Sequence, residues 1–398
     1  MANVTYYIGA GYSANALPIV ANYPERISTV VQILETTYKL GDKASVLGNE
    51  HTKYEVQKRF VEGLKWLARE SNPKRHASVD TYAKNLFLTG DDRYDELKAL
   101  VACYFLLEQF SWNDDEMIEK IINETMALYD LEEESDEDES DIINDIENKK
   151  DVRYDTFFAS IINKSGGVPK LDDRIHIISW NYDVQFELAL ASFFPETPKE
   201  GLPKLIQANL SSETERHILD TDRFSLTRLN GVASFFSREN KGVKNLENWL
   251  PALDNRALMA DVLQQIVQLY DLCTQPKPAR TVEPSISFAW EDSQSAKHAK
   301  EDAMKVMAET EYLVIGGYSF PYFNRETDRD LFSEMQRLEG VYINDENPAA
   351  IQEKLISVMP ALLREKPSRR IMVPIDKFTR DKIKPIPNTD QFFLPHEL

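Results

Sequence analysis

The sequence predicts an α/β protein with a Rossmann-like parallel sheet and a large helical insertion or second lobe. Short apolar runs have the length of buried strands, and long stretches with a helical spacing of apolar residues separate them. Strands that are apolar throughout are typical of parallel sheets covered by helices on both faces. The four predicted strands are Val4–Ile8, Ile175–Trp180, Tyr312–Ile315 and Gly340–Ile343.

The region between the first two strands has a helical pattern. The stretch Tyr54–Ala68 repeats apolar residues on one helical face, and Tyr94–Phe110 is apolar enough for a core helix. We therefore assign residues 1–23 and 170–365 to the sheet-containing core and residues 24–169 to a helical insertion. Residues 366–398 are dotted with proline, and we expect them to form an extended C-terminal arm.

An acidic run interrupts the helical insertion. Residues 130–147 carry eleven Asp and Glu side chains and no Lys or Arg. Such a run cannot bury itself, so we expect an acidic surface loop over residues 130–148. The alternative is that the run docks onto a basic partner.

Composition excludes several classes of protein. The formal net charge of −20 argues against broad contact with a phosphate backbone, so we expect no direct nucleic-acid binding. The chain has two cysteines, Cys103 and Cys273, which excludes a zinc site of four cysteines within one chain. No apolar run approaches the roughly 18 residues of a membrane span, and the first residues lack the pattern of a signal peptide. We therefore expect a cytoplasmic protein that binds no membrane.

Small and polar residues follow each predicted strand, at the sheet edge where parallel sheets bind ligands. They are Gly9-Ala10-Gly11-Tyr12-Ser13, Asn181-Tyr182-Asp183, Gly316-Gly317-Tyr318-Ser319 and Asn344-Asp345. The first matches the glycine pattern of dinucleotide-binding loops. Each motif also has a simpler interpretation, as a glycine turn, a helix cap or a plain loop. No acidic residue closes a second strand where a dehydrogenase needs one, which disfavours hydride transfer.

In this order, the motifs resemble those of the sirtuin-like NAD-binding family. The matching residues are Gly9, Ala10, Gly11, Ser13 and Pro18, then Trp180, Asn181, Tyr182 and Asp183, then Asn230 and Gly231, then Gly317, Tyr318 and Ser319, and finally Asn344. The resemblance covers roughly a third of the chain. It is strongest to the sirtuin-like subunits that accompany HerA-type hexameric translocases in bacterial anti-phage defence.

This resemblance implies hydrolysis of NAD⁺ to nicotinamide and ADP-ribose. It also implies a homo-oligomer and a partner, a HerA-type ATPase. Lysine deacetylation is disfavoured because the cysteines of the zinc ribbon are absent. No metal-binding motif is present, so we expect NAD as substrate and no metal.

The resemblance assigns a task to each matching residue. Gly9, Gly11 and Ser13 would hold the pyrophosphate, while Asn181 would position the attacking water and Asp183 would bind the carboxamide. Ser319 and Asn344 would contact the adenosine ribose.

The chain departs from the family at Asn230, which stands where a catalytic histidine is expected. Asparagine cannot act as a general base near neutral pH, so Asn230 would instead hold a ribose hydroxyl. The alternative is a regulatory subunit that binds NAD or ADP-ribose without turnover. His76 is a candidate substitute base, whereas His176 is expected to be structural. A metal-dependent nuclease is a third alternative, which is disfavoured because the sequence has no cluster of metal ligands.

A polar segment follows the third predicted strand. Asn324, Arg325 and Asp328 form a polar helix start there, either as capping and surface groups or with Arg325 reaching a phosphate or a neighbouring subunit.

Overall fold

The computed structural model describes residues 2–44, 51–109, 150–165, 168–194, 205–208, 218–240, 243–248, 259–276, 279–359 and 382–398. The chain divides into two compact units, of which the first comprises residues 1–15, 150–232 and 287–398. The second comprises residues 16–149 and 233–286. The predicted insertion is a single stretch, 24–169, whereas the second unit is built from two stretches. The acidic run 130–147 lies outside the described residues, so its assignment stays a prediction.

The first unit contains a six-stranded parallel sheet, which confirms the predicted Rossmann-like α/β class. Its strands lie in the order β11-β10-β9-β1-β4-β5. From β1 the chain builds the sheet outward through β4 and β5, then returns to the other side of β1 and continues through β9, β10 and β11. The strand order therefore reverses between β1 and β9, the position where open α/β sheets bind ligands. The bounds are β1 Val4–Ile8, β4 Ile175–Ser179, β5 Ser225–Arg228, β9 Tyr312–Gly316, β10 Gly340–Asn344 and β11 Ile383–Ile386.

The register brings the carboxyl ends of the central strands to one level. Ile8 pairs with Ser179 on one side and with Gly316 on the other. Gly316 in turn pairs with Asn344. The segments that follow these strands therefore emerge side by side along one edge of the sheet.

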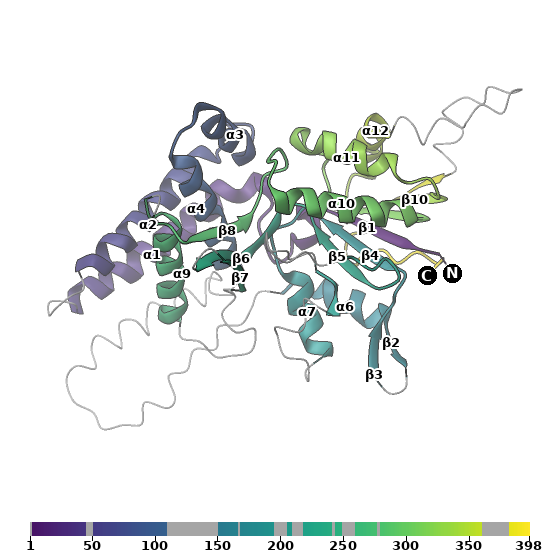
Figure 1. The fold of residues 1–398 in the computed structure, drawn as a ribbon, viewed down its shortest axis with the longest axis horizontal. Helices are drawn as coiled ribbons and strands as arrows, with labels where there is room; N and C mark the ends of the chain where they lie inside the picture. The colour runs from purple at the N-terminus through teal and green to yellow at the C-terminus, as the bar shows by residue number, and fades with distance from the viewer. Residues whose placement is uncertain are drawn as a thin grey trace, which may run out of the picture. The chain divides into compact units, whose positions relative to one another are not determined.

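Helices α10, α11 and α12 cover one face of this sheet (Figure 1). Their bounds are α10 Gln294–Glu309, α11 Arg325–Ser333 and α12 Pro348–Val358. Tyr7 of β1 and Ile178 of β4 point to this face, where they join a core with Met307, Phe332 and Leu355 of the three helices. This core fills the space between the sheet and the three helices.

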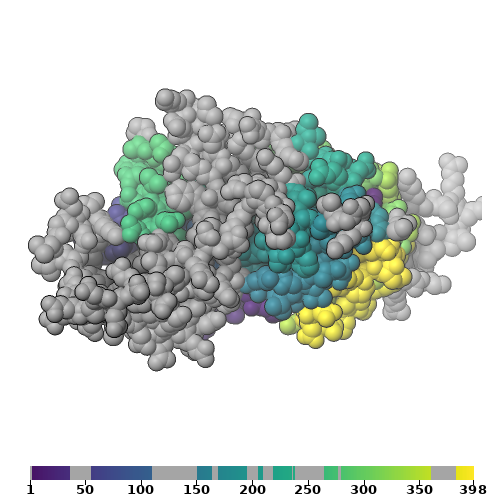
Figure 2. All heavy atoms as spheres, turned by 90° about the horizontal axis from the view of Figure 1, so that it is seen from below, coloured from purple at the N-terminus to yellow at the C-terminus, as the bar shows by residue number. Residues whose placement is uncertain are grey.

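Helices α6 (Val152–Ile161) and α7 (Gln185–Phe193) cover the opposite face. Successive residues of a strand point to opposite faces, so Tyr6 packs here, edge-on against Phe157 of α6. The C-terminal residues 387–398 cover the remainder of this face, and Figure 2 shows them in yellow at the surface. Phe392 stacks on Tyr12 with ring centroids 4.1 Å apart. A small hairpin of β2 (Ile162–Ser165) and β3 (Val168–Leu171) follows α6.

Two strands of the sheet were not predicted from the sequence, and each has a weak local pattern. β5 has the sequence Ser-Leu-Thr-Arg, with no continuous apolar run. β11 includes Pro385, which has no backbone N–H, and proline is tolerated in strands at a sheet edge. β5 and β11 lie at opposite edges of the sheet, where a strand needs fewer apolar residues because it has a neighbour on one side only.

The second unit is mainly helical. Helices α2 and α4 pack closely where Gly63 of α2 meets Leu100 of α4, and a Cβ at Gly63 would lie 2.8 Å from that leucine side chain. Phe60 of α2 packs against Tyr270 of α9. The elements are η2 Val20–Asn22, α1 Tyr23–Ala44, α2 His51–Glu70, α3 Val79–Thr89, α4 Arg93–Glu108, α9 Met259–Cys273 and a sheet of β7 (Val243–Asn248), β6 (Gly231–Asn240) and β8 (Val282–Ile286).

Membrane-spanning helices are not found among the described residues, where no helix combines the necessary length and apolar character.

The packing of Phe392 gives a first prediction. Its ring is 6% exposed and contacts Tyr12, Tyr154 and Phe157. Phe392→Ala should lower the free energy of unfolding by about 3–5 kcal/mol, because it leaves a cavity in an aromatic core. Urea denaturation measures this change. Tyr322→Ala is the control, since Tyr322 is 78% exposed. Equal losses in the two variants would contradict the packing role of Phe392.

Candidate functional site

The loops after β1 and β9 touch each other at the carboxyl edge of the sheet. The backbone N–H groups of Gly9 and Gly11 donate to the carbonyl oxygens of Gly316 and Gly317, at 3.1 and 3.0 Å. A Cβ on Gly11 would lie 2.7 Å from the Cα of Gly317, whose φ is +55°. Packing of the two loops therefore requires glycine at these positions. Both N–H groups are used within the chain, so in this conformation they do not face a pyrophosphate.

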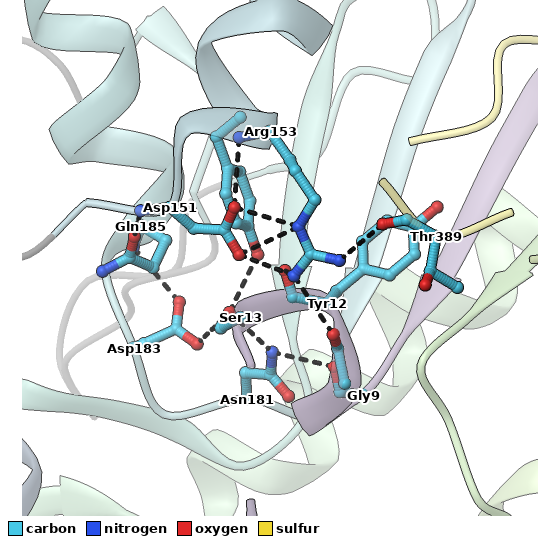
Figure 3. A network of polar contacts seen from close by, with 11 residues as sticks. Gly9, Tyr12, Ser13, Asp151, Arg153, Asn181, Asp183, Gln185 and Thr389 are labelled. Atoms are coloured by element: carbon cyan, nitrogen blue, oxygen red, sulfur yellow. Dashed lines mark hydrogen bonds and ion pairs between the residues drawn. The ribbon is translucent and has the colours of Figure 1, made fainter. Parts of the chain in front are cut away.

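Ser13 lies at the centre of a buried polar cluster (Figure 3). Its hydroxyl donates to Oδ2 of Asp183 at 2.7 Å and lies 2.9 Å from the hydroxyl of Tyr154. Asn181 donates through Nδ2 to the same hydroxyl at 3.3 Å and to the carbonyl of Gly9 at 3.1 Å. The structure thus brings together Gly9, Ser13, Asn181 and Asp183, which the sequence places as far as 174 residues apart.

These contacts determine how the Asn181 amide points. Both hydrogens of Nδ2 have acceptors, and Oδ1 has no hydrogen-bond partner among the described residues. The amide therefore presents its oxygen as an acceptor. Burial raises the pKa of Asp183, while hydrogen bonds from Ser13 and from the backbone of Gln185 act in the opposite direction.

Asn230 has a similar arrangement in the turn that follows the neighbouring strand β5. Its Nδ2 donates to the carbonyl oxygen of Trp180 at 3.2 Å, which places Asn230 beside the start of the Asn181 segment. Its side chain is 8% exposed, and its Oδ1 is buried with no partner among the described residues. Gly231 follows with φ +74°, as the turn requires. A buried amide oxygen without a partner is costly, and a donor from a ligand would satisfy it.

A buried ion pair holds this turn against α7. Arg228, two residues before Asn230, donates through both terminal nitrogens to Glu187, at 2.8 and 2.5 Å. Both side chains are buried. Glu187 lies in the first turn of α7, directly after the Asn181–Asp183 segment. The bidentate geometry therefore ties the two segments that carry the candidate amides.

Arg153 of α6 was not predicted from the sequence. Its guanidinium pairs with Asp151 and donates to the carbonyl oxygens of Gly11 at 3.3 Å and Tyr12 at 3.2 Å. It also donates to the carbonyl of Thr389 in the C-terminal segment at 3.0 Å (Figure 3). Arg153 thus links the glycine loop to the end of the chain. The carbonyl groups that it binds are distant in sequence, so no local pattern could have revealed this linking role.

The side-chain amide of Asn344 makes four hydrogen bonds within the chain. Its Oδ1 accepts from the hydroxyl of Tyr12 and from the backbone N–H of Phe393, both at 3.2 Å. Its Nδ2 donates to the carbonyl oxygens of Asn388 and Ile386, at 2.6 and 3.5 Å. The amide predicted to contact a ribose therefore holds the C-terminal segment in this conformation.

The remaining predicted residues make none of the hydrogen bonds of the buried cluster. Ala10 is half-buried in the loop after β1. Ser319 is exposed, and its carbonyl oxygen accepts from Lys354 at 2.9 Å. Pro18 belongs to the second unit, as does His76, whose Nε2 lies 3.1 Å from Glu70. Arg325 reaches the hydroxyl of Ser357 at 2.8 Å.

His176 is a buried residue of β4, and its Nδ1 lies 2.9 Å from the hydroxyl of Ser225 on β5. Burial lowers the pKa of His176 to about 4, so the ring is neutral at physiological pH. Among the described residues, no group of three or more His, Cys, Asp or Glu is arranged to hold a metal ion.

A second buried carboxylate lies on the other face of the sheet. Asp328 of α11, predicted to be part of a polar helix start, is 0% exposed. The hydroxyls of Tyr7 and Tyr318 donate to it, at 2.5 and 2.9 Å. Burial raises the pKa of Asp328 from its ordinary value of 3.8 to about 7, and the two tyrosine hydrogen bonds oppose this shift.

The site thus belongs to a Rossmann-like α/β protein with amides and a carboxylate beneath the glycine loop. Comparisons with protein-family models, with curated proteins and with solved structures find no match to this chain.

The raised pKa of Asp328 predicts how stability depends on pH. The folded protein keeps a proton on Asp328 up to about pH 7, whereas the unfolded chain releases it near pH 4. The free energy of unfolding of the wild type should therefore fall, relative to Asp328→Asn, by about 1.4 kcal/mol per pH unit across this window. Denaturant titrations at several pH values measure the difference, and parallel curves for the two proteins would contradict it.

Proposed function

We propose that this protein is an NAD⁺ glycohydrolase that cleaves NAD⁺ to nicotinamide and ADP-ribose. Asn181 and Asp183 carry the proposal. They follow the strand beside β1, at the edge where such sheets bind nucleotides, and they contact Ser13 of the glycine loop. The buried Oδ1 of Asn230 supports a ligand with hydroxyl donors, such as a ribose.

Cleavage of the nicotinamide–ribose bond passes through a cation of oxocarbenium character. Amide oxygens and a carboxylate held in place before the reaction stabilise developing positive charge. In this mechanism Oδ1 of Asn181 accepts a hydrogen bond from the attacking water or a ribose hydroxyl. Asp183, anchored by Ser13 and Gln185, supplies negative charge and orients the carboxamide. The leaving nicotinamide takes the bonding electrons, and water then adds to the ribose carbon and releases a proton to the solvent.

Asn230 stands at the position where the resemblance predicts a general base, so the site has no proton acceptor there. Its amide cannot accept a proton near neutral pH, and general-base assistance typically contributes about 10²–10⁴-fold to a rate. A bond that breaks before water attacks depends less on that assistance. We therefore assign Asn230 to holding a ribose hydroxyl through its unpartnered Oδ1.

The wider setting follows from the resemblance to sirtuin-like defence proteins. We propose a cytoplasmic homo-oligomer that depletes NAD⁺ during phage infection when a HerA-type ATPase partner activates it. This step rests on analogy, because a fold and a site do not by themselves identify a partner.

The second candidate is a regulatory subunit that binds NAD or ADP-ribose without turnover. Asn230 favours it, because an asparagine side chain cannot act as a general base near neutral pH. Such a site would bind a nucleotide and report its presence to the partner.

Substitution of Asn181 tests the enzyme directly. Asn181→Ala should abolish nicotinamide release, because it removes the acceptor aimed at the reacting centre. Chromatography of nicotinamide and ADP-ribose, with and without the ATPase partner, measures the reaction. Asn85→Ala, an exposed asparagine of α3, is the matched control and should retain full activity. Retained activity in Asn181→Ala would overturn the site assignment, whereas NAD binding without release by the wild type would favour the regulatory subunit.

Restoring a base at position 230 gives a separate prediction. Asn230→His should raise the rate of NAD⁺ cleavage about 10-fold or more, because histidine can take a proton near neutral pH. Initial rates over a pH range measure this gain, which should appear as pH rises through the histidine pKa. An unchanged rate, in a variant that still binds NAD, would show that this side chain does not face the ribose.

A further inference from the structure

Asp328 stands at the end of a chain of buried hydrogen bonds. The indole Nε1 of Trp180 lies 2.8 Å from the hydroxyl oxygen of Tyr7, and that hydroxyl lies 2.5 Å from Oδ1 of Asp328. The hydroxyl of Tyr318 lies 2.9 and 3.0 Å from the two carboxylate oxygens. The four side chains come from β1, from the segment after β4, from the loop after β9 and from α11.

The direction of each hydrogen bond follows from the chemistry of the groups. An indole N–H can only donate, so the oxygen of Tyr7 accepts from Trp180. The proton of Tyr7 is then available for Asp328, and an ionised carboxylate accepts from both tyrosines. Because bonds to a carboxylate are stronger than those between neutral groups, Asp328 holds both rings in place.

The residues that this carboxylate holds adjoin the candidate site. Trp180 directly precedes Asn181, Tyr318 directly follows Gly317, and Tyr7 lies two residues before Gly9. Trp180 and Tyr318 also stack, with their ring planes within 3° and their centroids 6.1 Å apart. A single buried group therefore constrains three of the segments that meet at the carboxyl edge.

Among the residues that the structure describes, no Lys or Arg forms an ion pair with Asp328. On α10, Lys300 pairs with Asp330 of α11, and Lys305 pairs with Asp302. On α12, Lys354 donates to Ser319. Arg325, at the start of α11, donates to Ser357. Asp328 instead lies among apolar side chains, where an unpaired charge is costly unless its hydrogen bonds are complete.

We propose that Asp328 is a positioning residue for the candidate site: its carboxylate, through Tyr7 and Tyr318, holds the Asn181 segment and the Gly317 loop in the arrangement that receives a nucleotide. The part of this inference that concerns the nucleotide rests on the proposed function. The part that concerns the two segments applies to the protein without ligand.

Protonation of Asp328 should loosen the arrangement. A neutral carboxyl group must donate its own proton, so one tyrosine hydroxyl has to turn its hydrogen away. Because burial raises the pKa of Asp328 to about 7, the ionised form prevails above this pH and the protonated form below it. The two tyrosine hydrogen bonds lower the pKa of Asp328, so they are stronger with the ionised form. Against motions that keep Asp328 buried, the two segments should therefore be held most firmly above pH 7, although ionisation lowers the free energy of global unfolding over the same range.

Hydrogen–deuterium exchange on the full chain without ligand tests the positioning role. After correction for intrinsic exchange, Asp328→Asn should exchange about 10-fold faster than the wild type over residues 178–184 and 316–320 at pH 8. The difference should shrink at pH 6, where the wild type is protonated. Asp302→Asn, a buried aspartate of α10 that contacts Lys305, is the matched control and should match the wild type in both segments. Equal exchange in Asp328→Asn and the wild type would overturn the proposal.

Kinetics of NAD⁺ cleavage test the consequence for the site. Asp328→Asn should lower kcat/KM about 10- to 100-fold, since small displacements of positioned groups cost this much, and its pH profile should lose the limb near pH 7. Tyr318→Phe, which removes one hydroxyl and keeps the ring, should give a smaller loss in the same direction. Asp302→Asn should retain the wild-type profile.

The two experiments separate the possible failures. A wild type that neither binds nor cleaves NAD⁺ contradicts the proposed function, while the exchange measurement still decides the role of Asp328. A wild type that cleaves NAD⁺, together with unchanged kcat/KM and pH profile in Asp328→Asn and Tyr318→Phe, overturns the positioning role.

Discussion

The close approach of the loops after β1 and β9 is the constraint on which the candidate site depends. Gly11 and Gly317 meet at a distance that excludes any Cβ, so the backbones themselves form the contact. This contact turns the chain so that the ring of Tyr12 enters the aromatic core with Phe392 and the hydroxyl of Ser13 reaches Asp183. The buried cluster and the packing of the C-terminal segment against Tyr12 both follow from this contact between the loops.

The polar groups of the site are held from both faces of the sheet. On one face, Arg153 binds the carbonyl oxygens of the glycine loop and of Thr389, and Ser13 joins Asn181 to Asp183. On the other face, Asp328 receives two tyrosine hydroxyls. Each bond removes freedom from a side chain or a loop at the carboxyl edge. Amide oxygens whose own nitrogens are already engaged are then presented in a defined direction, as preorganised binding requires.

The buried carboxylates of this acidic chain differ in the groups that bind them. Glu187 and Asp151 each have an arginine partner, so their cost of burial is offset by bidentate pairing. Asp183 and Asp328 are held by neutral donors, and burial raises the pKa of both. Groups with perturbed pKa values and no structural counter-ion are often functional. Both lie beside segments that the proposed reaction uses.

The apolar runs of β1, β4, β9 and β10 were sufficient to predict the parallel sheet, because strands buried on both faces must be apolar throughout. They also predicted that the polar segments after the strands lie along one edge, since the ends of parallel strands share that edge. β5 and β11 could not be predicted, because edge strands need fewer apolar residues and tolerate proline. The sequence by itself thus determined the fold class and the neighbourhood of Asn181 and Asp183. Only the tertiary structure decided the roles of Arg153, Asn344 and Asp328, because their partners come from distant segments that folding alone brings into contact.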